Sequence, residues 1–136
     1  IFNELSSNHS NTTHMHDQLN LYRIAAAIEL ITGVTLLLLP GFIVQILFQA
    51  KAIGAEPYLA QLYGLALIGL GVACWSQPCP MSAQRGITIY NVVAAVFLFV
   101  LIAKAISGGL MVLAAASLHL VLGALMIIDQ LKQRSI

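Results

Sequence analysis

The chain has 136 residues, of which 60% are hydrophobic and only 8% are charged, and its formal net charge is +1. A soluble domain carries roughly a quarter charged residues, so this composition excludes an ordinary water-soluble globule. The small net charge gives no reason to expect nucleic acid or an acidic substrate as a partner. We therefore predict an all-α integral membrane protein in contact with the lipid bilayer, because lipid requires backbone polar groups to be satisfied within each segment.

Residues 1–18 form a polar leader that is rich in Asn, Ser, Thr and His, and its composition predicts a flexible segment. His9, His14 and His16 could bind zinc or copper through neutral imidazoles, but no other His or Cys completes a metal-site spacing. The leader also contains two formal N-glycosylation triplets, Asn8–Ser10 and Asn11–Thr13. We favour a solvated leader over either kind of site.

Four apolar stretches follow the leader, each close to the roughly 20 residues that a helix needs to cross a bilayer. They span residues 19–39, 58–75, 86–106 and 110–128. Residues 42–50 are apolar but too few to cross, so we expect a continuation or a short interfacial helix there. The sequence thus predicts a four-helix transmembrane bundle over residues 19–129 and a polar tail over residues 130–136.

Positively charged residues near the ends of the spans predict the orientation of the chain. With four spans, both termini share one side with the loop between the second and third spans. The basic residues of that side are Arg23, Arg85, Lys132 and Arg134, against Lys51 and Lys104 on the other side. This count predicts that both termini are cytoplasmic, in what we expect to be a bacterial inner membrane.

The two cysteines, Cys74 and Cys79, lie on either side of a turn that contains Pro78, and Pro80 follows. Their spacing differs from the Cys-x-x-Cys of dithiol oxidoreductases, and two thiols alone do not complete a zinc site. They could approach disulfide distance across the turn. Because cytoplasmic thiols are kept reduced, we expect free structural cysteines.

Two ionisable residues lie deep inside the predicted spans, Glu29 in the first and His119 in the fourth. At a rise of 1.5 Å per residue each is about 14–15 Å deep, so the two side chains could meet on antiparallel helices. Such groups are costly in a bilayer and mark functional sites by default. The pair could share or relay a proton, or bind a metal or haem. Asn91, Gln61 and Tyr63 are expected to supply supporting polar groups.

A purely structural interpretation stands beside this one. Polar side chains also join transmembrane helices through hydrogen bonds, and small residues let helices approach closely. The small residues expected at helix contacts are Ala60, Gly64, Gly69, Ala115 and Gly123. His119 lies between Ala115 and Gly123 at a spacing of four, so a buried pair of Glu29 and His119 could simply hold the bundle together.

One stretch resembles a known family. The course from "GVTLLLLPG" (Gly33–Gly41) through a short loop into "LAQLYGLALIGLGVACW" (Leu59–Trp75) resembles small bacterial four-helix membrane proteins of the DoxX-like type. In that group a Gly-rich second span follows a Pro-terminated first span. The resemblance implies a four-helix fold and, as for some members, association with respiratory or redox enzymes. Neither the leader histidines nor His119 map onto it.

Two functions follow from these features. The first is a non-catalytic membrane subunit that docks by its small-residue faces onto a larger complex, respiratory or redox in kind, or onto itself. The alternative is a small carrier or a proton- or redox-handling protein that uses Glu29 and His119. Known phosphate-loop, Ser-His-Asp and His-Glu-x-x-His motifs are missing from the sequence, which favours a protein that is not an enzyme. We predict no cofactor, although haem, copper and quinone stay open.

Overall fold

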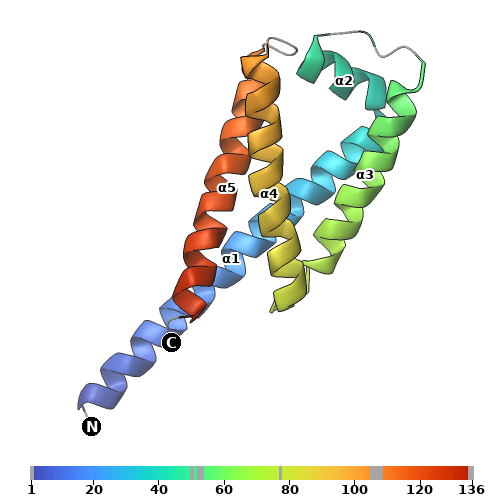
Figure 1. The fold of residues 1–136 in the computed structure, drawn as a ribbon. Helices are drawn as coiled ribbons and strands as arrows, with labels where there is room; N and C mark the ends of the chain where they lie inside the picture. The colour runs from blue at the N-terminus through green and yellow to red at the C-terminus, as the bar shows by residue number, and fades with distance from the viewer. Residues whose placement is uncertain (1, 50, 52–53, 77, 105–108, 135–136) are drawn as a thin grey trace.

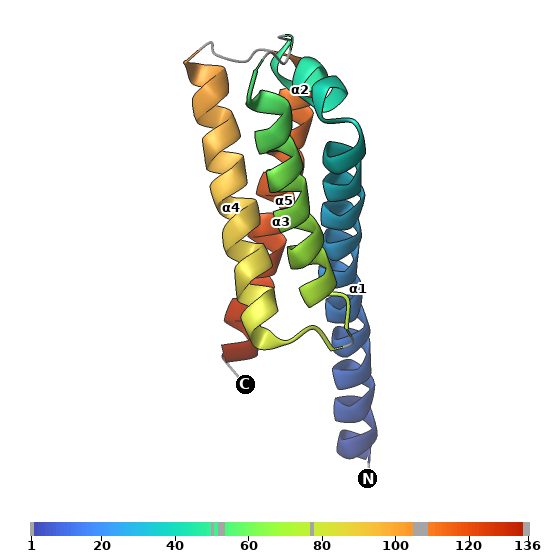
Figure 2. The ribbon, with the colours of Figure 1, turned by 90° about the vertical axis from the view of Figure 1, so that its right-hand side faces the viewer.

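The computed structural model describes the chain except for residues 1, 50, 52–53, 77, 105–108 and 135–136. The described part is helical, with α1 (Phe2–Leu38), α2 (Pro40–Phe48), α3 (Glu56–Ala73), α4 (Met81–Ala103) and α5 (Leu110–Arg134). The long helices alternate in direction (Figure 1; Figure 2). The start of α1, the end of α5 and the α3–α4 connection therefore lie at one end of the molecule, here called the disulfide end for the bridge described below.

Three of these helices are long and apolar enough to cross a membrane, namely α1 over Asn20–Leu38, α4 and α5. Large apolar side chains are exposed along all of them, as lipid contact requires. α3 is not in this group, because its first turns carry Glu56, Pro57 and Gln61. The structure thus supports an all-helical membrane protein with three candidate spans. The prediction of a fourth span is not confirmed.

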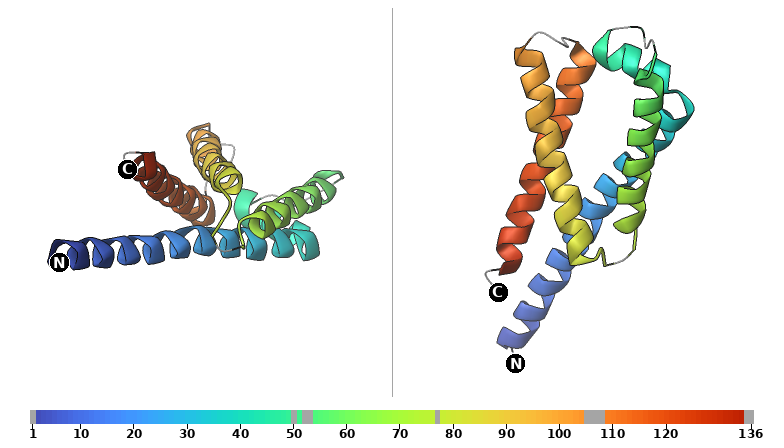
Figure 3. Two further views of the ribbon diagram at one scale, coloured as in Figure 1. Left: turned by 90° about the horizontal axis from the view of Figure 1, so that it is seen from below. Right: turned by 45° about the vertical axis from the view of Figure 1, so that its right-hand side comes forward.

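The helices associate as two closely packed pairs, α1 with α3 and α4 with α5, and contacts between the pairs are sparse (Figure 3). Glycines bring α1 and α3 together: a Cβ on Gly33 would lie 2.6 Å from the carbonyl oxygen of Gly64. A Cβ on Gly71 would lie 2.9 Å from the carbonyl oxygen of Ala26. Small residues thus let the two backbones touch. We call the boundary between the two pairs the seam.

α1 and α2 are separated at Pro40, which occupies the first turn of α2. Proline lacks an N–H and clashes with the preceding turn, so it begins a helix but does not continue one. α2 lies across the end of the bundle opposite the disulfide end (Figure 1), and none of its residues is buried. The sequence predicts either a continuation of the first span or a short interfacial helix here, and α2 is a separate short helix.

The helical backbone extends beyond the predicted transmembrane domain at both ends. α1 begins at Phe2, within the predicted flexible leader, but side chains are described only from Asn20 onward. The side chains of His9, His14 and His16 therefore lie outside the described part. α5 continues to Arg134, and the basic residues of its last turn favour helix, because cations interact well with the C-terminal end of the helix dipole.

The contact between α1 and α3 can be tested by substituting Gly64. The Cβ of Gly64→Ala would lie 2.6 Å from the carbonyl oxygen of Gly33 and 3.0 Å from the Cβ of Leu36. We expect the free energy of unfolding in detergent to fall by about 1–3 kcal/mol, the usual cost of overpacking. Gly69→Ala is the matched control on the same helix, because nothing lies within 4 Å of its Cβ. Equal effects of the two substitutions would contradict the close contact.

Candidate functional site

Three polar side chains from three helices meet at the seam: Glu29 of α1, Asn91 of α4 and His119 of α5. Nδ1 of His119 lies 2.8 Å from Oδ1 of Asn91. Nδ2 of Asn91 donates to the carbonyl oxygen of Ile87 at 2.8 Å. The Glu29 carboxyl lies close enough to the Asn91 side chain to interact with it electrostatically. Asn91 therefore stands between the two ionisable residues and connects them.

The orientation of the Asn91 amide determines which ring nitrogen of His119 carries the hydrogen. An amide oxygen can only accept a hydrogen bond, so Nδ1 of His119 must donate to it. The other ring nitrogen, Nε2, is then the position at which this imidazole can accept a bond or gain a proton. Nδ2 of Asn91 donates a hydrogen bond to the carbonyl oxygen of Ile87, and the Asn91 side chain interacts electrostatically with Glu29.

Glu29 is buried but incompletely satisfied. It is 1% exposed, and Asn91 is 0% exposed. Among the buried side-chain oxygens and nitrogens of the described residues, Oε1 of Glu29 and Oε1 of Gln84 have no hydrogen-bond partner. Leaving such a group unpaired in the interior costs about 1–3 kcal/mol. The Glu29 carboxyl therefore retains a bonding position that the protein itself does not use.

Helical periodicity explains why these groups share the seam. On α4, Gln84, Thr88 and Asn91 follow the i, i+4, i+7 spacing of one helix face, and Thr88 and Asn91 are buried. On α1, Glu29 shares its face with buried Tyr22, seven residues earlier, and with two buried alanines. Exposed apolar residues such as Ile24 of α1 and Ile89 of α4 lie on the other faces of these helices. A polar face on an otherwise apolar helix thus lines the interior.

Two tyrosines connect this site with the outer surface of α3. The hydroxyl oxygens of Tyr63 and Tyr90 are 2.6 Å apart. The ring of Tyr90 packs edge-on against His119, with centroids 5.5 Å apart and planes at 89°. Tyr63 is 45% exposed. Tyr90, which precedes Asn91 in the chain, was absent from the predicted site residues. The sequence feature that could have identified it is a hydroxyl-bearing side chain inside an apolar span.

The predicted residue Gln61 does not join this cluster. Its Nε2 donates to the carbonyl oxygen of Leu37 at 3.0 Å. That carbonyl lies in the last turn of α1, where helical carbonyls lack partners within the helix. Gln61 therefore stabilises the end of α1 from the neighbouring helix.

The predicted packing residues also divide into two groups. Gly64 and Gly123 are buried at contacts within the chain, and a Cβ on Gly123 would lie 3.0 Å from Cγ2 of Val92. Ala60 and Ala115 are half-buried, and Gly69 is exposed.

Among the described residues, no three His, Cys, Asp or Glu side chains lie together as potential metal ligands. The histidines of the leader lie outside the described side chains.

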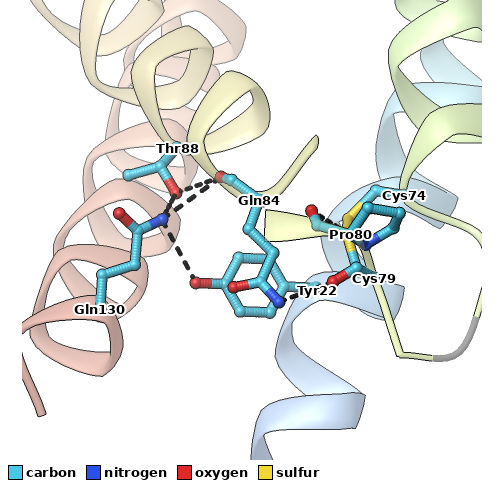
Figure 4. Close-up of a disulfide and its surroundings, with 7 residues drawn as sticks. All are labelled: Tyr22, Cys74, Cys79, Pro80, Gln84, Thr88 and Gln130. Carbon is cyan, nitrogen blue, oxygen red and sulfur yellow. Dashed lines mark hydrogen bonds between the residues drawn. A yellow bond between two sulfur atoms is a disulfide. The ribbon is translucent and has the colours of Figure 1, made fainter. Parts of the chain in front are cut away.

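A second polar cluster lies at the disulfide end (Figure 4). Nε2 of Gln130 lies 2.8 Å from Oγ1 of Thr88, 3.4 Å from the Gln84 carbonyl oxygen and 3.5 Å from the Tyr22 hydroxyl. Nε2 of Gln84 donates to the carbonyl oxygen of Cys79 at 2.8 Å. The cluster joins α1, α4, α5 and the α3–α4 connection. Gln130 was assigned to the polar tail from the sequence, so its interior role was missed.

Cys74 and Cys79 form a disulfide, with Cα atoms 4.8 Å apart, so the prediction of free cysteines is wrong. The prolines of the connection turn the chain back and bring the two Cα atoms within bridging range. The prediction of reduced thiols depended on a cytoplasmic position of this loop. Both cysteines are buried, at 0% and 6% exposure, in a core that includes Tyr22 and Ala26 of α1.

Comparisons with protein-family models, with curated proteins and with solved structures give no match. The resemblance to DoxX-like proteins therefore stays a prediction from the sequence. The chemistry of the site must be inferred from its own geometry.

The contact between His119 and Asn91 can be tested with a double-mutant cycle. Each single substitution, His119→Ala or Asn91→Ala, should lower the free energy of unfolding by about 1–3 kcal/mol, because it leaves a buried partner unpaired. The double variant should lose less than the sum of the two. A cycle of His119→Ala with Gln61→Ala, which breaks a separate hydrogen bond, is the control and should be additive. Additivity in both cycles would show that His119 and Asn91 are independent.

The disulfide should contribute measurably to stability. A bridge that closes so short a loop is worth about 2 kcal/mol on the chain-entropy relation. The Cys74→Ser/Cys79→Ser variant should lose that amount in detergent unfolding, and reduction of the native protein should give the same loss. An unchanged unfolding transition after verified reduction would contradict this expectation.

Proposed function

We propose that this protein binds and releases a proton, alone or with a small ligand, at Glu29, Asn91 and His119 inside a membrane bundle. The buried Glu29 carboxyl, with no protein partner for Oε1, is the observation that carries the proposal. A carboxyl kept only to hold helices together should have its bonding positions filled, because each open one weakens the bundle. Intramembrane carboxyls are also costly enough to suggest a function.

The three side chains would have different roles in binding the proton. Glu29 and His119 are the groups that can change protonation state, whereas the Asn91 amide cannot and acts as a positioning residue. Asn91 holds Nδ1 of His119 and faces the Glu29 carboxyl, which leaves Nε2 and Oε1 as the proton-accepting atoms. The hydroxyl pair of Tyr63 and Tyr90 provides donors and acceptors between the outer surface and the imidazole.

The proposal includes α3 as a fourth membrane-crossing helix. α3 runs antiparallel to α1 and packs along it (Figure 2), which supports a four-span bundle with both termini on one side. The count of basic residues supports cytoplasmic termini in a bacterial inner membrane. The Cys74–Cys79 bridge weighs against that orientation.

A second candidate function is a non-catalytic subunit that docks onto a larger membrane complex, of the respiratory or redox kind that the DoxX-like resemblance implies. Ala66, Gly69 and Ala73 are exposed and lie about one helical turn apart on α3, so another helix could approach there. Gly64 and Gly123 do not support this function, because they are buried in contacts within the chain. Co-purification of a stoichiometric partner in gentle detergent would favour this function.

The proton-binding proposal is tested by Glu29→Gln in lipid. Difference infrared spectra across a pH titration should show the carbonyl band of a protonated carboxylic acid in the native protein. Glu29→Gln should lose this band, because the amide preserves size but cannot exchange the proton. Glu56→Gln removes an exposed carboxyl at the start of α3 and should keep the band. A band that survives Glu29→Gln would refute the assignment.

A further inference from the structure

We infer that the disulfide end of the bundle, with both chain ends beside it, faces an oxidising compartment. This orientation is the reverse of the one that the overall count of basic residues predicts. The inference concerns topology and goes beyond the proposed proton site, and it does not depend on Glu29. It starts from the bridge between Cys74 and Cys79 in the connection from α3 to α4.

Disulfides form and persist outside the cytosol, where thiols are not held reduced by glutathione and thioredoxin. When the bridge forms, the two thiols lose two electrons and two protons in total. A disulfide-bearing oxidoreductase of the oxidising compartment accepts them by thiol–disulfide exchange and becomes a dithiol. The loop must therefore be on the side of the membrane that contains such an oxidant.

The bridge is part of the folded core at this end. Cys74 and Cys79 pack with Tyr22, Ala25 and other buried residues, and Gln84 donates a hydrogen bond to the Cys79 carbonyl. Because the sulfurs are shielded in the folded protein, exchange with an oxidant has to occur before α1 covers them. The loop thus meets the oxidising side during folding.

The loops alone agree with this orientation, whereas the full count of basic residues near the span ends, four at the disulfide end against two at the other, favours the reverse. The two connections at the opposite end contain Lys51 and Lys104, whereas the α3–α4 region at the disulfide end contributes Arg85, which lies within α4. Residues 1–18 contain no Lys or Arg and carry Glu4 and Asp17. By the loops alone, the positive-inside rule places the opposite end in the cytoplasm.

The other basic residues of the disulfide end are Arg23, Lys132 and Arg134, and against them the inference rests on the bridge. Arg23 lies inside the candidate span of α1, with its guanidinium carbon 5.5 Å from the ring centroid of Trp75. That contact gives the cation a local partner at the membrane boundary. Lys132 and Arg134 lie in the last turn of α5, where they interact favourably with the C-terminal end of the helix dipole.

The first test determines the redox state of the native chain in cells. Cells are quenched with acid, the protein is denatured, and a polyethylene glycol maleimide is added with or without prior reduction. We expect two additions after reduction and none without it. Two additions without reduction would mean free thiols and would overturn the inference.

The second test measures sidedness with a matched pair of single cysteines in a Cys74→Ala/Cys79→Ala chain. Ser82→Cys marks the disulfide end and Ala55→Cys marks the opposite end, and both positions are exposed. A membrane-impermeant maleimide applied to intact cells, after removal of any outer membrane, should label Ser82→Cys. It should label Ala55→Cys only after permeabilisation. The reverse pattern would overturn the inference, and neither result bears on the protonation of Glu29.

Discussion

Polar bonds across the seam, together with a small buried core at the disulfide end, hold the two helix pairs of this protein together. Lipid is as apolar as the helix surfaces, so burying apolar side chains gives little drive for helices to associate inside a membrane. Close backbone contact supplies that drive within the α1–α3 pair, where Gly33 faces Gly64. Between the pairs the described contacts are sparse, and polar bonds such as Tyr63 to Tyr90 and Gln130 to Tyr22 take part in this role.

Two ionisable side chains near the seam have polar atoms that the protein itself leaves unbonded. Glu29 has an oxygen without a protein partner, and His119 has a ring nitrogen beyond its bond to Asn91. Groups that can bind a proton therefore lie at the same boundary as the polar bonds between the helix pairs, which is why structural and functional interpretations meet there.

Composition alone was enough to predict the helical membrane class, because so few charged residues cannot cover a water-facing surface. Depth along the helices also placed Glu29 and His119 in one region. The connecting role of Asn91 could not be predicted, because it depends on how α4 is rotated about its axis. Gly64 and Gly69 illustrate the same limit of sequence-based prediction. Their spacing identifies both as small residues on a helix, but only the packed structure shows that Gly64 is buried at a contact and Gly69 is exposed. The disulfide was missed because thiol chemistry was inferred from a predicted orientation.

The central claim is that Glu29 lies against Asn91 at the seam and carries an exchangeable proton. Solid-state NMR of the protein in lipid bilayers, with labelled Glu side-chain carboxyls and Asn side-chain amides, tests both parts in one measurement. We expect a through-space cross-peak between the Glu29 carboxyl carbon and the Asn91 side-chain nitrogen, and a Glu29 carboxyl shift that changes with pH. A missing cross-peak, contact of the carboxyl with lipid, or a shift that stays constant across the titration would contradict the claim.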